Sequence, residues 1–168
     1  MSLVARMFPV VTAVALMAAS RVASAQAPEG KPGPAAPWVQ RDDVMILPAN
    51  DHAQLAIVAY VAPANHQVVF GLRELPQGAS CTPSAIGMGR LYEIQGKRVP
   101  FRKECVGGLF TFVPKGMPAT KAFNDLLNGT RTLQILSPTK TPFNFDLTAL
   151  ETVRRKLDAD AVASRNGE

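Results

Sequence analysis

Short apolar runs separated by turn residues recur through the middle of the chain, and they constrain the fold most. Gln54–Val61 is continuously apolar after its first residue, which is typical of a central strand buried on both faces. Gln67–Leu75 follows after Ala64–His66, a connection of hairpin length. Runs this short, with Asn, Asp, Pro and Gly at their flanks, predict strands that pair antiparallel with their neighbours in sequence.

Five more runs in the second half of the chain have the same character. Gly96-Lys97 separates Leu91–Gln95 from Arg98–Cys105 and predicts a tight hairpin, because glycine readily adopts the positive φ that such a turn needs. The predicted strands are Leu91–Gln95, Arg98–Cys105, Leu109–Val113, Thr130–Leu136 and Phe143–Phe145.

Two helices are predicted beside these strands. Ala119–Leu127 has apolar residues at helical spacing, and Asn128-Gly129 predicts a left-handed end to that helix. Thr148 and Glu151 have the spacing of a capping box at the start of a second, C-terminal helix. The fold class predicted is mainly β: an antiparallel β-sandwich or open barrel with two short helices, the second near the C-terminus.

The N-terminus has the three parts of a secretory signal peptide. Arg6 is the one charge before an apolar run, Phe8–Ala19, and Ala23-Ser24-Ala25 supplies the small residues of a cleavage site. The run is shorter than the roughly 20 residues of a membrane-spanning helix. We therefore expect residues 1–25 to be a signal peptide, the protein to be exported, and no membrane span in the mature chain.

The remaining chain is long enough for one domain. Residues 26–37 are rich in Pro and Gly and predict a flexible leader, residues 38–161 a single β-rich domain, and residues 162–168 a frayed tail. Loss of the signal peptide removes two of 18 basic residues and none of 13 acidic ones, which leaves a net charge of +3. A charge this small does not indicate nucleic acid as a partner.

Cys81 and Cys105 are the only cysteines. An even number of cysteines behind an export signal predicts a disulfide between them. The only histidines, His52 and His66, do not stand at metal-ligand spacing from either cysteine. We therefore expect no metal and no cofactor.

No set of residues predicts catalysis. Both histidines fall in predicted turns, so neither is a positioned base for a serine nucleophile. Glu74, Glu93 and Glu104 fall on different predicted strands, which disfavours a catalytic carboxylate pair. We expect a protein without enzymatic activity, with a small hydrolase of unrecognised site as an alternative.

A basic group surrounds the predicted Leu91–Cys105 hairpin, and Arg98 and Arg102 within it share strand parity. One interpretation is an ordinary solvated surface; the other is a contact patch for an anionic partner, such as a surface polysaccharide or an acidic protein. Aromatic residues are too few there for a nucleic-acid stacking platform. The candidate partner-binding residues are Arg90, Lys97, Arg98, Arg102 and Lys103.

Leu75-Pro76-Gln77-Gly78 has the pattern Leu-Pro-x-Gly, and Pro100–Lys103 is a Pro-Phe stretch followed by Cys105 and Gly108. A predicted helix and strand follow, and then Pro142–Leu157. In these parts the C-terminal half resembles the invasion-associated locus B family of exported proteobacterial proteins, which has a Leu-Pro-x-Gly turn and a Pro-Phe-x-x-Cys stretch with a later glycine.

The chain also departs from that family. Glu104 is an extra residue before Cys105, and the family's second cysteine nearby is absent, so the resemblance leaves Cys81 as the partner of Cys105. It implies a small exported β-rich protein, periplasmic or secreted, of a Gram-negative bacterium. It also implies no known enzymatic activity, with a link to host-cell invasion in some members. We expect a non-enzymatic binding or accessory module of the bacterial envelope; a structural envelope component that assembles through the edge of its sheet is a further alternative.

Overall fold

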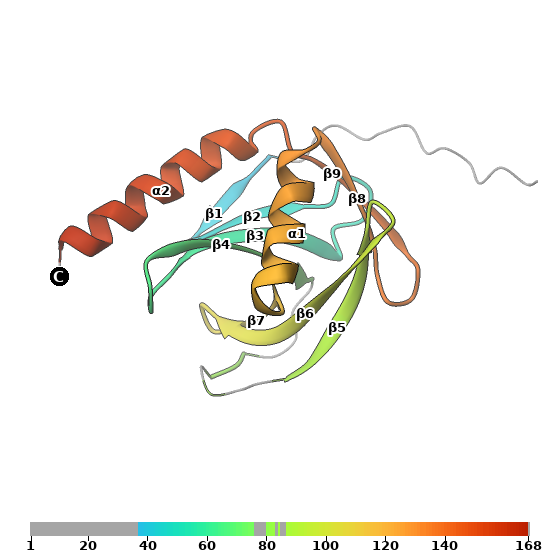
Figure 1. Ribbon diagram of the computed structural model, residues 1–168, viewed down its shortest axis with the longest axis horizontal. Helices are drawn as coiled ribbons and strands as arrows, with labels where there is room; N and C mark the ends of the chain where they lie inside the picture. The colour runs from blue at the N-terminus through green and yellow to red at the C-terminus, as the bar shows by residue number, and fades with distance from the viewer. Residues whose placement is uncertain (1–36, 76–79, 83, 85–86, 168) are drawn as a thin grey trace, which may run out of the picture. The chain divides into compact units, whose positions relative to one another are not determined.

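A computed structural model describes residues 37–75, 80–82, 84 and 87–167. The predicted signal peptide and nearly all of the predicted leader lie outside the described residues. The fold is mainly β, as the sequence predicts, with two helices (Figure 1). The elements are β1 Val39–Arg41, β2 Val44–Pro48, β3 Leu55–Ala62, β4 Gln67–Glu74, β5 Gly87–Ile94, β6 Lys97–Val106, β7 Leu109–Pro114, α1 Gly116–Asn128, β8 Thr132–Leu136, β9 Pro142–Asp146 and α2 Leu150–Asn166.

All nine strands form one antiparallel sheet in the order β1-β2-β3-β4-β7-β6-β5-β8-β9. The sheet is open, and it curls until its last strand reaches the turn between β2 and β3. There the Asn50 amide donates to the Asn144 carbonyl at 2.8 Å, and the Asn144 side chain donates to Asp51 Oδ2 at 2.7 Å. These contacts occupy part of the outer edge of β9.

Strand β3 is buried on both faces, which confirms the sequence prediction for this run. Leu55, Ile57 and Ala59 belong to the main core, which also takes in the apolar faces of α1 and α2. The alternate residues Val58 and Tyr60 belong to a second, smaller cluster on the opposite face. β3 therefore contributes to the packing on both faces of the sheet.

The β5–β6 hairpin and helix α1 form for the reasons that the sequence indicates, with two local differences. The first is the hairpin turn, which consists of Gln95 and Gly96, with φ angles of 48° and 76°, and not of Gly96-Lys97. Helix α1 buries Ala119, Phe123 and Leu127 at four-residue spacing. Its end is right-handed at Gly129, with φ −83°, so the left-handed ending expected there is wrong.

The start of α2 also differs from its prediction. The N-cap residue is Ala149, and no side chain caps the helix. The Thr148 hydroxyl instead donates to Asp146 Oδ1 at 2.5 Å, so the expected capping box does not form. The helix continues to Asn166, five residues beyond Ala161, its last buried residue, where the predicted tail begins.

Candidate functional site

Strands β4 and β7 meet closely at a single point of the sheet. Their register consists of one pair, Leu72 with Phe112, whereas β3 pairs with β4 along its whole length. At this point a Cβ on Gly71 would lie 2.7 Å from the Phe112 carbonyl oxygen, so only glycine allows the strands to approach so closely. Among the described residues, no strand pairs with Gln67–Phe70 on the side away from β3.

The space beside this part of β4 is a groove of about 830 Å³, which we call the β4–α1 groove. Apolar side chains from both sides form much of its wall. Arg102 and Lys121 are its charged residues, and none of its lining residues is acidic. The lining residues are Gln67, Val68, Val69, Phe70, Arg102, Val113, Pro114, Gly116, Met117, Pro118, Thr120, Lys121 and Asn124.

The two basic side chains of the groove keep their charges at the surface. Arg102 pairs with Glu104 at 2.5 Å, and Lys121 pairs with Asp125 at 2.7 Å. The side chains of Arg102 and Lys121 are 55% and 78% exposed, so each pair is weak and solvent-screened. Both cations therefore stay available to a ligand.

The first turn of α1 forms one wall of the groove. Its N-cap residue, Lys115, makes no side-chain capping bond, and the turn contains no acidic residue. Backbone N–H groups at a helix start carry partial positive charge when nothing caps them. The groove therefore has the side chain of Arg102 on the β6 side, and on the α1 side that of Lys121 and the N–H groups of a helix start without a side-chain cap.

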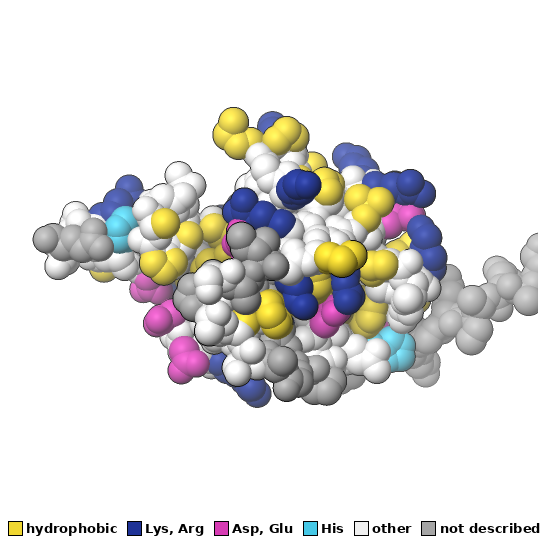
Figure 2. Space-filling model, turned by 90° about the horizontal axis from the view of Figure 1, so that it is seen from below, with side chains coloured by type: hydrophobic (Ala, Val, Ile, Leu, Met, Phe, Trp, Pro, Cys, Tyr) yellow, Lys and Arg dark blue, Asp and Glu magenta, His cyan; other side chains and the backbone are white. Residues whose placement is uncertain are grey.

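Arg98 and Arg102 lie on the same face of β6, because the side chains of Val99 and Phe101 between them point into the core. Arg102 lines the β4–α1 groove, whereas Arg98 lines a separate hollow of about 450 Å³ together with Arg90 and Lys140. Figure 2 shows Lys and Arg side chains spread over one face of the molecule, with hydrophobic side chains between them.

The other candidate residues of the basic hairpin have separate surroundings. Arg90 pairs with Glu74 and lies 5.0 Å from the centre of the Phe112 ring. Lys103 lies 3.9 Å from the centre of the Phe110 ring. Lys97 is exposed and pairs in register with Ile94 at the β5–β6 turn. Of the five predicted residues, the structure brings only Arg102 into the groove.

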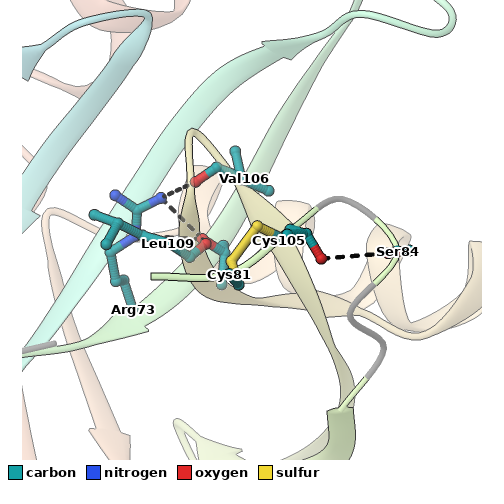
Figure 3. Close-up of a disulfide and its surroundings, with 8 residues drawn as sticks. Arg73, Cys81, Ser84, Cys105, Val106 and Leu109 are labelled. Carbon is teal, nitrogen blue, oxygen red and sulfur yellow. Dashed lines mark hydrogen bonds between the residues drawn. A yellow bond between two sulfur atoms is a disulfide. The ribbon is translucent and has the colours of Figure 1, made fainter. Parts of the chain in front are cut away.

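The two cysteines lie together beside the β6–β7 turn. Their sulfur atoms are 2.12 Å apart, a distance that fits a disulfide and an oxidising compartment. The Cys81 amide also donates to the Gly108 carbonyl at 2.9 Å. Figure 3 shows the guanidinium of Arg73 next to this pair, where it donates to the Val106 carbonyl at 3.0 Å.

The carboxylates that the sequence places on different strands each pair with a different base. Glu74 pairs with Arg90, Glu93 with Lys140 and Glu104 with Arg102. A hydrogen bond from Lys140 lowers the pKa of Glu93. Across the described residues, no group of three or more His, Cys, Asp and Glu side chains could hold a metal ion.

Sequence reasoning missed most of the groove. Met117, Lys121 and the one-sided stretch of β4 meet there only because α1 returns across the sheet beside β4 (Figure 1). The one signal in the sequence is Lys115-Gly116, a break between a strand and a helix, which places the start of the helix next to the sheet.

In the described part of the chain, no helix has the length and apolar character needed to cross a membrane.

Comparison of the chain with family models, with curated proteins and with solved structures finds no match. The resemblance to the invasion-associated locus B family therefore stays a prediction.

Proposed function

We propose that the chain is exported and that its domain is a non-enzymatic binding module of the bacterial envelope, which takes an anionic partner in the β4–α1 groove. The observation that carries the proposal is the composition of the groove: apolar walls, Arg102 and Lys121 at the surface, and no acidic lining residue. A concave site that is mostly apolar, with a few charged groups, is the usual form of a ligand site. Family membership and a part in host-cell invasion belong to the same proposal.

The arrangement of charges supports a binding function more than hydrolysis. A hydrolytic site needs a base and a nucleophile or two carboxylates in mutual reach. In the described residues the glutamates pair singly with arginine or lysine, and His52 is exposed, with its ring against Phe143. The alternative of assembly through a sheet edge has less support, because Asn50 and Asp51 occupy part of the edge at β9 and β1 has only three residues.

The test compares two arginines of one strand. Arg102→Gln removes a charge from the groove, and Arg98→Gln removes the same charge from the same face of β6 outside the groove. We expect Arg102→Gln to weaken adsorption of the purified protein to isolated envelope at low salt, because charges that attract a partner act mainly on association and its salt dependence. Arg98→Gln serves as the matched control and should bind as the parent protein does.

Equal loss in both variants would mean that general surface charge, not the groove, attracts the envelope. Unchanged binding in both would reject the proposed function. The same preparation tests export: protein recovered from the periplasm should have the intact mass of a chain that begins at Gln26, and a mass that retains residues 1–25 would contradict cleavage there.

A further inference from the structure

We propose that the β4–α1 groove binds an extended, negatively charged peptide, which adds to Gln67–Phe70 as a strand in the place that β7 leaves open. The inference rests on the proposed function and names the class of its partner.

The first observation is the backbone of β4. Gln67–Phe70 has a neighbouring strand, β3, on one side only, and it lies in the wall of the groove on the other side. A strand presents N–H and C=O groups alternately to its two sides. Gln67–Phe70 therefore presents to the groove backbone groups that another strand can pair with, over about 13 Å at 3.3 Å per residue.

The second observation is the apolar surface beside that backbone. Val68 and Val69, which are partly exposed, line the groove from the sheet, and Met117 lines it from α1. The side chain of Met117 is 86% exposed although it stands at the edge of an apolar groove. An added strand turns alternate side chains towards this wall, where apolar ones would cover Met117.

The third observation is charge, which selects among the possible occupants. Arg102 and Lys121 line the groove, whereas the exposed acids that pair with them, Glu104 and Asp125, lie outside the lining. The first turn of α1 contains no acid. A peptide with a carboxylate complements this charge. A second copy of this chain, with a net charge of +3 after loss of residues 1–25, complements it less well.

The test uses the protein recovered from cells that express the full chain. The probe is a peptide of alternating threonine and valine, about six residues long, with an uncharged fluorophore at its N-terminus and a free C-terminal carboxylate. Binding is measured by fluorescence anisotropy. Two further peptides carry N-methyl groups on alternate residues: one is methylated at the odd positions, and the other at the even positions. Because alternate N–H groups of a strand point to opposite sides, we expect one phase to abolish binding and the other to retain it.

Two protein variants form a matched pair. Met117→Ser removes an apolar side chain at the groove, and Met88→Ser removes one of the same size that is 89% exposed elsewhere. Burial of a methionine in a complex stabilises it enough that Met117→Ser should weaken peptide binding about tenfold. Met88→Ser should leave it unchanged. Hydrogen exchange should slow when the peptide binds at those amides of Gln67–Phe70 that point away from β3, and not at those that face β3.

Several results would overturn the inference. Equal binding of both N-methylated phases would show that the ligand does not pair as a strand. Equal effects of Met117→Ser and Met88→Ser would place the peptide elsewhere, and binding of the C-terminal amide as tightly as of the carboxylate would remove the charge argument. Self-association that rises with protein concentration and is lost in Met117→Ser would identify a second copy as the occupant.

The outcomes separate this inference from the proposed function. If no peptide binds while Arg102→Gln still loses envelope adsorption, strand addition is wrong and the binding module stands. If the peptide binds as expected while envelope adsorption does not depend on Arg102, the groove takes peptides and the proposed envelope partner is wrong.

Discussion

Arg73 links two parts of the sheet that the backbone joins at one pair only. It is 2% exposed, and its guanidinium donates to Thr111 Oγ1 at 2.9 and 3.2 Å and to the Val106 carbonyl at 3.0 Å. Burial lowers its pKa, since desolvation disfavours the charged form. Because β4 and β7 share the single pair Leu72 with Phe112, the side chain of Arg73 supplies bonds that a longer ladder would otherwise make.

Replacement of Arg73 by methionine should destabilise the fold. The variant fills similar space, but it leaves the Val106 carbonyl and the Thr111 hydroxyl without their donor. We expect the free energy of unfolding to fall by about 1–3 kcal/mol, measured by urea denaturation. The free energy of unfolding of Arg73→Lys should lie between those of the parent protein and Arg73→Met, because an ammonium group cannot reproduce the planar fork of a guanidinium.

The control for Arg73 is Arg155→Met on α2. The side chain of Arg155 is 72% exposed, and such surface changes usually stay within about 0.5 kcal/mol. Arg73→Met at or above the stability of the parent protein would contradict a stabilising role, since a buried charge can cost more than its bonds return.

At the scale of elements, sequence patterns predicted the strands with the clearest apolar runs and both helices. The strand predicted over Gln67–Leu75 is β4, which ends one residue earlier at Glu74. The continuous apolar run of β3 predicted its burial on both faces. The start of α2 was less predictable, because Asp146 Oδ1 accepts the backbone N–H of Thr148 that Glu151 would accept in a capping box. Strands β1 and β2 were not predicted, since the pattern of residues 39–48 is short and interrupted by Asp42-Asp43.

The candidate site was predictable only in part. Parity alone placed Arg98 and Arg102 on one face, and β6 retains that parity through Pro100. Which of the two reaches a groove depends on where β4 and β7 diverge and where α1 crosses. Those are long-range contacts, and no local pattern in the sequence encodes them.

The disulfide connects the segment between β4 and β5 to the β6–β7 hairpin. Cys81 and Cys105 are separated by 24 positions, so the bond closes a loop of moderate length. Cys105→Ser should lower the free energy of unfolding by about 2–5 kcal/mol, the usual effect in a small secreted domain. Urea denaturation checks the size of the change.

A thiol count provides the control for the disulfide. Native protein purified without reductant should show no reactive thiol before reduction and two after it. Two thiols in the native protein would contradict the bond, and a Cys105→Ser variant as stable as the parent would show that the loop is held by its other contacts, such as Cys81 to Gly108.

At the scale of the whole molecule, the two tyrosines connect its stability to alkaline pH. Burial, and then the negative charge of Glu104, raise the pKa of Tyr60 to about 12. Burial and the nearby Glu74 also raise the pKa of Tyr92 above its ordinary value of 10.0. In both cases the folded state favours the neutral phenol more than the unfolded state does.

The sign of the pH dependence follows from these shifts. The contribution of each tyrosine is complete below the unfolded pKa of about 10 and is lost as pH rises towards the folded pKa. We expect the free energy of unfolding to fall between about pH 10 and pH 12. Tyr60 and Tyr92 are the only tyrosines, so Tyr60→Phe with Tyr92→Phe should flatten that decline. An equal slope in the double variant would assign the decline to lysine and arginine.

The contact of Asn50 with Asn144 also has a consequence for the order in which the fold can form. A chain synthesised from its N-terminus produces the β2–β3 turn 94 positions before its partner on β9 exists. Contacts between residues so distant in sequence slow folding, because the entropy of closing the loop is lost before the contact forms. The curl of the sheet therefore cannot close before β9 has been made, and until then the β2–β3 turn lacks this contact.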